Sequence, residues 1–145
     1  MNLEKVFKNK KVIVTGHTGF KGSWLTLWLT EIGANVLGVS KDIPTIPSHY
    51  ELLGLGKKVK SKKIDIQNLK EIKKIIKTFK PDFIFHLAAQ SIVRKSYSST
   101  IETWKTNLMG TVNILESLKE NKKETITVII TSDKCYKNIE KIKGY

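Results

Sequence analysis

Three glycines stand three residues apart near the N-terminus, in the segment Gly16-His17-Thr18-Gly19-Phe20-Lys21-Gly22. Such a turn lets backbone N–H groups approach a bound phosphate, because glycine has no Cβ to hold the ligand away. The β-branched run at 11–15 before it predicts a buried strand, and an apolar stripe from Phe20 to Ile32 predicts a helix. The start of that helix presents unpaired N–H groups and a positive dipole end. The arrangement predicts a site for the diphosphate of a dinucleotide.

A second group of candidate residues follows two further predicted strands. In doubly wound sheets, ligands lie beyond the carboxyl ends of the strands, at the switch point of the strand order. We expect the small residues of 87–90 to let a nicotinamide pass close to the backbone. We expect Asp65 to accept a hydrogen bond from the adenine and Ile66 to pack against it, with a helix cap as the alternative for Asp65. The cofactor-binding candidates are therefore Gly16, Thr18, Gly19, Phe20, Lys21, Gly22, Asp65, Ile66, Leu87, Ala88, Ala89 and Gln90.

Strand and helix patterns alternate along the whole chain. This alternation predicts an α/β fold, a Rossmann-type doubly wound parallel sheet with helices on both faces. A connection at 40–56 is expected to hold one short helix near 50–53. The predicted strands cover 11–15, 35–39, 59–64, 82–87 and 125–131, and the predicted helices cover 20–32, 69–79 and 98–121.

The charge of the chain is strongly positive, with 26 basic and 13 acidic residues and a net charge of +13. Only Arg94 is an arginine, whereas reading of nucleic-acid bases favours the bidentate arginine fork. No aromatic and basic platform accompanies the lysines, so we expect solvated lysine faces and no nucleic-acid partner. The lysine run at 57–63 is typical of a protected sheet edge. An anionic ligand such as a nucleotide diphosphate is favoured by this charge.

The remaining composition bears on compartment and metals. No apolar run reaches the roughly 20 residues that cross a bilayer, so we expect no membrane partner. The polar N-terminus is unlike a signal peptide, and the single cysteine, Cys135, cannot form an internal disulfide, which predicts a cytoplasmic location. His49 and His86 lack metal-ligand spacing, so no metal is expected.

The end of the second predicted strand bears on the choice of dinucleotide. An acidic residue there would bind the ribose 2′-hydroxyl and favour NAD. The sequence reads Gly38-Val39-Ser40-Lys41-Asp42, so the carboxylate arrives late and a lysine precedes it. We expect NAD, and Lys41 leaves the 2′-phosphate of NADP open.

Four motifs occur in a familiar order: the glycine turn, the segment 87–90, Asn107-x-x-Gly110-Thr111 and Thr131-Ser132-Asp133-Lys134. Together they resemble the nucleotide-sugar branch of the extended short-chain dehydrogenases. Within that branch, the longer stretches 17–25, 89–97 and 131–138 resemble the CDP-glucose 4,6-dehydratases, with Ser132-Asp133-Lys134 as the most discriminating piece. The resemblance implies that NAD takes a hydride from C4 of CDP-glucose, water leaves across C5 and C6, and the hydride returns to C6. The product is CDP-4-keto-6-deoxyglucose. By the same resemblance, Asn107, a further cofactor-binding candidate, supports the backbone at the active-site helix, with an exposed polar helix position as the alternative. We expect His17, within the glycine turn, to help position cofactor or substrate.

The resemblance places the catalytic groups after the fifth strand. Ser132 would hydrogen-bond the C4 oxygen, and Asp133 would protonate the departing C6 hydroxyl. Lys134 would assist removal of the C5 proton or stabilise the enolate, and it acts as a base only if its pKa is lowered. As alternatives, Asp133 caps a turn and Lys134 is a surface lysine.

The tyrosine–lysine pair of this family, Tyr-x-x-x-Lys, has no match in the sequence: Gly54, Ile101 and Glu140 stand four residues after Tyr50, Tyr97 and Tyr136. We therefore expect residues 1–145 to be an incomplete NAD(P)-binding domain, truncated before the later strands and the substrate domain. The isolated chain should bind NAD weakly or not at all, without turnover. The alternatives are another sugar-nucleotide epimerase or dehydratase, or a non-catalytic nucleotide-binding fragment. A homo-oligomer is possible for the full-length protein.

Overall fold

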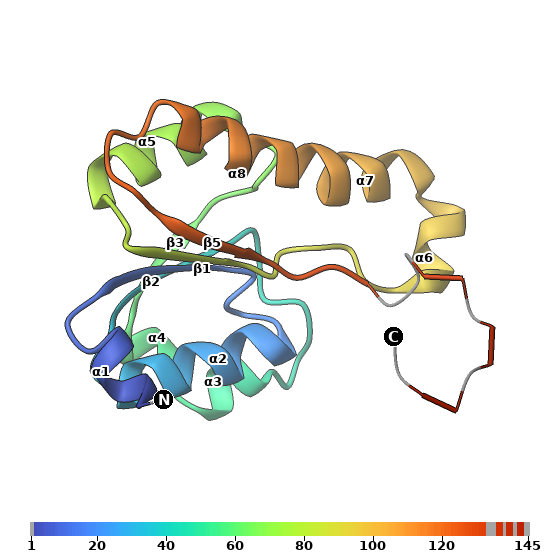
Figure 1. Cartoon of the computed structure of the whole chain (residues 1–145). Helices are drawn as coiled ribbons and strands as arrows, with labels where there is room; N and C mark the ends of the chain where they lie inside the picture. Colours follow the sequence, from blue (N-terminus) through green and yellow to red (C-terminus); the bar gives the residue numbers. More distant parts are fainter. Residues whose placement is uncertain (1, 133–135, 138, 141, 144–145) are drawn as a thin grey trace.

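A five-stranded parallel sheet forms the centre of the computed structural model, which describes residues 2–132, 136–137, 139–140 and 142–143. The strand order is β3-β2-β1-β4-β5, and all four neighbouring pairs are parallel. This order confirms the predicted doubly wound sheet, with its switch point between β1 and β4. The strands are β1 (Lys11–Thr15), β2 (Asn35–Ser40), β3 (Lys60–Lys63), β4 (Phe83–His86) and β5 (Ile126–Ile129), as Figure 1 shows.

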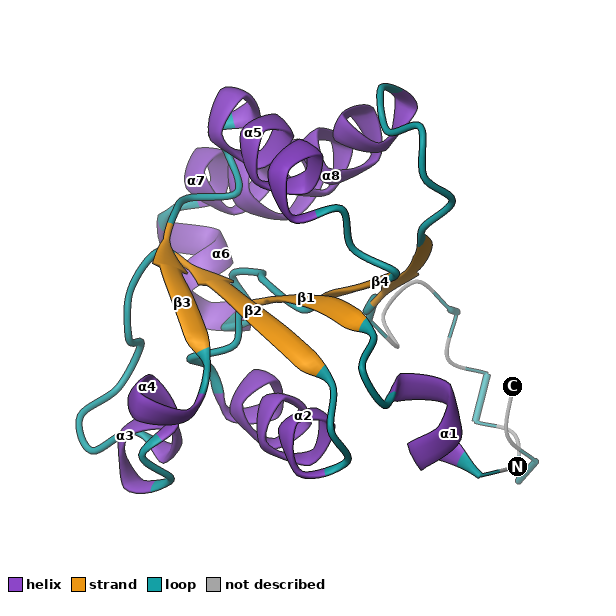
Figure 2. Cartoon of the chain, turned by 90° about the vertical axis from the view of Figure 1, so that its left-hand side faces the viewer, coloured by secondary structure: helices purple, strands orange, loops and turns teal. Residues whose placement is uncertain are grey.

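Helices cover the two faces of the sheet as separate layers (Figure 2). The chain crosses one face on its way from β1 to β2 and β3, and the other face on its way to β4 and β5, as right-handed crossovers require. One layer holds α1 (Leu3–Phe7), α2 (Phe20–Glu31), α3 (His49–Leu52) and α4 (Leu55–Lys58). The opposite layer holds α5 (Leu69–Phe79), α7 (Thr100–Trp104) and α8 (Gly110–Lys119).

The segment after β4 differs from its prediction. A continuous helical stretch runs from α7 through a π-helical turn, η1 (Lys105–Met109), into α8, which confirms the predicted long helix over most of its length. A separate helix, α6 (Val93–Ser98), precedes it, and Ser99 breaks the path with φ −133° and ψ 54°. The periodicity of apolar residues missed α6 because none of its residues is buried. The prediction of one short helix near 50–53 was also incomplete, since α3 and α4 both form there.

Two apolar clusters hold the helices to the sheet. Val12 and Val14 of β1 are fully buried toward α1 and α2, whereas Ile13, 2% exposed, faces α5 and α8. A strand buried on both faces reads as a continuous β-branched run, which is why 11–15 was recognisable. Phe7 of the short helix α1 packs edge-on against Trp28 at 5.9 Å between ring centroids. Helix α1 was not predicted, because one turn of helix carries too little periodicity.

Within the part of the chain that the structure describes, no helix is long and apolar enough to cross a membrane.

The helical layer on the α5 side leaves several apolar side chains in contact with solvent. They are Tyr97, Ile101, Trp104 and Leu108, between 49% and 83% exposed.

The contact between the first strand and α2 leaves no room for a side chain at Gly22. A Cβ there would lie 2.0 Å from the carbonyl oxygen of Gly16 and 2.9 Å from the Cα of His17. Both are backbone atoms, so the turn itself would have to move. Gly22 is therefore required by the packing of α2 against the turn.

We predict that Gly22→Ala lowers the free energy of unfolding by about 1–3 kcal/mol, the usual cost of overpacking. Gly56→Ala is the matched control. Gly56 is also helical, and its added Cβ would meet only the side chain of Tyr50, at 3.3 Å from the hydroxyl oxygen, and no backbone atom. Urea unfolding of the three proteins gives the comparison. Equal stability of Gly22→Ala and Gly56→Ala would contradict the packing account.

Candidate functional site

The glycine turn and the residues after β4 meet at the carboxyl ends of the central strands. Gly16 has φ +73°, and its N–H donates to the carbonyl of Val39 at 2.8 Å. A Cβ on Gly16 would lie 2.8 Å from the backbone nitrogen of Ala88. Only glycine permits this approach. The structure thus brings together the two groups of residues that the sequence analysis selected for a dinucleotide.

The turn leads directly into α2 without a side-chain cap. Gly19 is the N-cap residue in an extended conformation, φ −75° and ψ 170°, and offers no oxygen to the N–H groups of the first turn. Thr18 is nearly buried, and its hydroxyl donates to the carbonyl of Asp42 at 2.6 Å. Phe20 and Lys21 are exposed at the helix start. A helix N-terminus without a cap is suited to bind an anion, because its N–H groups and dipole remain available.

His17 lies beneath the turn. Its side chain is 1% exposed, and its ring nitrogens hydrogen-bond to the hydroxyls of Ser40 and Ser61, each at 2.8 Å. The ring also contacts Tyr50 edge-on, and a Cβ on Gly38 would lie 2.2 Å from it. Burial lowers the pKa of His17, which keeps the ring neutral. His17 therefore joins the glycine turn to β2 and β3. His17 itself is buried, so it would affect a bound ligand only by holding the turn in position.

Asp65 lies after β3 in a network of charges. Lys41 contacts the carboxylates of Asp65 at 3.0 Å and Glu102 at 3.6 Å. The hydrogen bond to Asp65 raises the pKa of Lys41. The Asp65 carboxylate also accepts the N–H of Gln67 at 2.9 Å. The N-cap of α5 is Asn68, so the alternative prediction of a helix cap at Asp65 was wrong.

Ile66 belongs to the core. Its side chain is 4% exposed, and its Cδ1 would lie 2.3 Å from a Cβ added to Gly110. Its carbonyl accepts the side-chain amide of Asn113 at 2.9 Å. The predicted contact between Ile66 and an adenine is not tested by these contacts and stays a prediction.

Two clamps hold the residues that follow β4, 87–90, which we call the strand-exit loop. At its start, the Thr15 hydroxyl accepts the N–H groups of Leu87 and Ala88, both at 3.1 Å. At its end, the Asn107 side chain accepts the N–H of Gln90 at 2.7 Å and donates to its carbonyl at 3.0 Å. Asn107 stands on the π-helical turn η1, a geometry that often marks functional positions. The predicted role of Asn107 in supporting the backbone agrees with this geometry.

His86, the last residue of β4, lies between the two clamps. Its Nδ1 is 2.7 Å from the Thr15 hydroxyl and its Nε2 is 3.0 Å from the Thr111 hydroxyl. The side chain is 3% exposed, and burial lowers its pKa from 6.5 to about 4. Sequence reasoning assigned no role to Thr15 or Thr111. The signal available was a buried strand that ends in histidine, which must find partners for both ring nitrogens.

The three catalytic candidates are only partly described. Ser132 lies exposed, beyond the end of β5. Asp133 and Lys134 lie outside the described residues, as does Cys135. The assignment of these groups to the reaction therefore stays a prediction.

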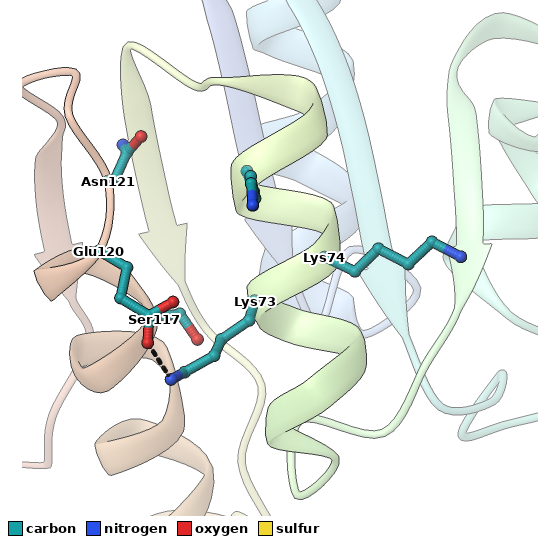
Figure 3. Close-up of a pocket in the computed structure, with 6 residues that line it drawn as sticks. Lys73, Lys74, Ser117, Glu120 and Asn121 are labelled. Carbon is teal, nitrogen blue, oxygen red and sulfur yellow. Dashed lines mark hydrogen bonds and ion pairs between the residues drawn. The ribbon is translucent and has the colours of Figure 1, made fainter.

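Two hollows of the surface lie away from the glycine turn. One of about 230 Å³ lies between α5 and α8, toward their C-terminal ends, where the helix dipole disfavours an anion. Lys73 and Glu120 form an ion pair across it (Figure 3). A second, of about 350 Å³, lies beside Asn107 and Trp104. Among the residues that the structure describes, no group of three or more His, Cys, Asp or Glu could hold a metal ion.

The low pKa of His86 predicts how stability depends on pH. The unfolded chain binds a proton at this histidine as the pH falls through 6.5, whereas the folded protein binds it only near about 4. The free energy of unfolding therefore has its full value above pH 6.5 as far as His86 is concerned. It falls as the pH drops from 6.5 toward about 4, by up to about 1.4 kcal/mol per pH unit.

Urea unfolding of the wild type and His86→Gln at about pH 7 and about pH 5 measures this difference. The wild type should lose more stability on acidification than the variant. His17 remains in both proteins, so its own titration cancels. Equal losses in the two proteins would contradict a neutral buried His86.

Comparison with known proteins gives the same picture of the fold. Residues 13–143 match the family described as GDP-mannose 4,6 dehydratase. CDP-glucose 4,6-dehydratase of Salmonella typhimurium is 50% identical over 139 residues, which are 96% of this chain and 39% of that protein. The chain thus spans about two-fifths of the length of this relative.

Two solved structures show the same architecture. An epimerase of Methanothermobacter thermautotrophicus superposes with a TM-score of 0.83 and 27% identity, covering 100% of this chain and 42% of that one. UDP-glucose 4-epimerase of Thermus thermophilus, solved with NAD, has a TM-score of 0.68 and 26% identity, covering 79% and 35%. The chain belongs to the GDP-mannose 4,6-dehydratase family of extended short-chain dehydrogenases and is a homologue of CDP-glucose 4,6-dehydratase.

Proposed function

We propose that this chain is the dinucleotide-binding part of an NAD-dependent CDP-glucose 4,6-dehydratase. The observation that carries the proposal is the uncapped start of α2 at Gly19, in contact through Gly16 with the strand-exit loop. Together they form a cradle that a Cβ would fill, open to an anion on one side. The 50% identity to the Salmonella dehydratase supports this substrate over those of other nucleotide-sugar enzymes.

The residues present fit a dinucleotide. The N–H groups at the start of α2 would hold the pyrophosphate, and the strand-exit loop would lie along the nicotinamide half. Asp65, beyond β3, would accept a hydrogen bond from the adenine alongside its contact with Lys41. When bound, NAD supplies a hydride acceptor for C4 of the sugar and returns the hydride to C6. The turn and the loop would orient the cofactor.

The charges near β2 favour NAD over NADP. Lys41 has Asp65 and Glu102 as neighbours, so two carboxylates balance its single positive charge. A 2′-phosphate would bring further negative charge to the same region and be repelled. Lys41 therefore does not supply an unpaired cation for NADP. This supports the expected preference for NAD.

The chemistry assigned to the residues after β5 is part of the same proposal. Ser132 would donate to the C4 oxygen, Asp133 would protonate the leaving hydroxyl at C6, and Lys134 would take the C5 proton or stabilise the enolate. Support comes from the match of residues 13–143 to the dehydratase family.

A non-catalytic nucleotide-binding fragment is the second candidate. A homo-oligomer and a cytoplasmic location stay predictions. The exposed Trp104 and Leu108 are compatible with burial against another surface.

Gly19→Asp separates ligand binding from folding. Aspartate is a favoured N-cap residue, so the thermal midpoint should stay the same or rise. Its carboxylate would occupy the position proposed for the diphosphate, and affinity for NAD should fall by at least about tenfold. Because the isolated chain is expected to bind weakly, NMR titration is the suitable measurement.

Gly19→Ser is the matched control, since it caps the helix without charge. It should retain more NAD affinity than the aspartate variant. An unchanged dissociation constant for Gly19→Asp would contradict a diphosphate at the turn.

Turnover tests the dehydratase assignment. The 145-residue chain alone should not convert CDP-glucose. A chimera in which it replaces the matching 39% of the Salmonella protein should convert it, and Asp133→Asn in the chimera should lower kcat by about 10²–10⁴-fold. A folded, NAD-binding chimera that does not convert CDP-glucose would contradict the dehydratase assignment.

A further inference from the structure

One chain of hydrogen bonds connects the two clamps of the strand-exit loop. It runs from Thr15 through His86 to Thr111. The Thr111 hydroxyl then donates to the backbone carbonyl of Asn107 at 2.7 Å. Thr15 holds the start of the loop, and Asn107 holds its end. Within this series of hydrogen bonds, the His86 side chain spans the distance from Thr15 on β1 to Thr111 on α8.

The donors and acceptors of this chain admit one arrangement. A threonine hydroxyl has one hydrogen and two acceptor positions. The Thr15 hydroxyl faces the N–H groups of Leu87 and Ala88 with its two acceptor positions, and the Leu87 N–H is shared with the Thr15 carbonyl at 3.2 Å. The hydroxyl hydrogen then points to Nδ1 of His86. His86 then carries its proton on Nε2 and donates it to Thr111, which donates in turn to Asn107.

The opposite end of the chain imposes the same direction. The Thr111 hydroxyl uses its only hydrogen on the Asn107 carbonyl and so can only accept from Nε2 of His86. If His86 carried a proton on Nδ1, the Thr15 hydroxyl would face three donors, and Nε2 would meet the Thr111 oxygen without a hydrogen between them. One tautomer of His86 therefore satisfies the contacts at both ends.

We propose that His86 is a positioning residue that couples the two clamps, so that the strand-exit loop keeps the conformation that receives the nicotinamide half of the cofactor. The role toward the cofactor rests on the proposed function. The coupling itself rests only on the contacts of Thr15, His86, Thr111 and Asn107.

The coupling is tested at a distance from the change. Thr111→Val removes the acceptor for Nε2 and keeps the shape of the side chain, while Thr15 remains intact. Amide hydrogen exchange should become about tenfold faster at Gln90 and also at Ala88, which Thr111 does not touch. The increase at Leu87 should be smaller, because its N–H keeps the bond to the Thr15 carbonyl. Thr111→Ser restores the hydroxyl and should restore slow exchange at all three.

Ile72→Val is the control for a general loss of stability. Ile72 is a core residue of α5 outside the chain of hydrogen bonds, and its shortening should not single out the three loop amides. Faster exchange at Gln90 alone in Thr111→Val would show two independent clamps and overturn the proposal. If Thr111→Val does not fold, His86→Gln serves, since it can keep the donor to Thr111 but cannot keep both contacts.

The imidazole nitrogens of the wild type give a second test. A long-range ¹⁵N–¹H spectrum should show the proton of His86 on Nε2. A proton on Nδ1 would overturn the proposal without any variant.

Cofactor affinity separates this proposal from the proposed function. Thr111→Val should weaken NAD binding by about tenfold relative to Thr111→Ser and Ile72→Val. Unchanged affinity alongside coupled exchange would refute the role toward the cofactor. The proposed function itself is tested by titrating NAD into a chimera of the wild-type chain and the remainder of the Salmonella protein. If this chimera binds no NAD, the proposed function fails, and the exchange data still decide the coupling.

Discussion

The backbone of Gly16 approaches the backbone of Ala88 so closely that a single methyl group would separate the two segments. This contact joins the end of β1 to the exit of β4 at the switch point of the sheet. Neighbouring features are arranged around it: Gly22 lets α2 pack against the turn, and Thr15 holds the strand-exit loop from below. A dinucleotide site needs these two pieces of backbone side by side, because one holds phosphates and the other lies along the nicotinamide.

The polar groups beneath the site are neutral and fully engaged. His17 and His86 are both buried, and each ring has a hydroxyl partner at both nitrogens. Charges lie at the rim, where Lys41 meets Asp65 and Glu102. Neutral side chains beneath the positive end of α2 suit an anionic ligand, since no buried charge competes with that ligand. The many lysines elsewhere are mostly exposed and contribute general positive charge rather than a defined site.

The sequence was sufficient for the sheet because buried parallel strands have a local signature. The run at 11–15 and the glycine spacing each reflect a constraint that acts within a few residues. The Asn107 clamp and the His86 contacts could not be predicted from local pattern. They join residues 17 to 71 positions apart, and their geometry depends on how η1 lies over the sheet. The helix α6 was missed for a different reason, since an exposed helix carries no apolar stripe.

The central claim is that the glycine turn and the strand-exit loop bind one dinucleotide together. A map of backbone amide shifts during titration of the 145-residue chain with NAD tests it most directly. The account predicts that the amides of 16–22 and 87–90 shift with the same dissociation constant, however weak. Shifts confined to the lysine-lined hollow between α5 and α8, with the glycine turn unchanged, would contradict it.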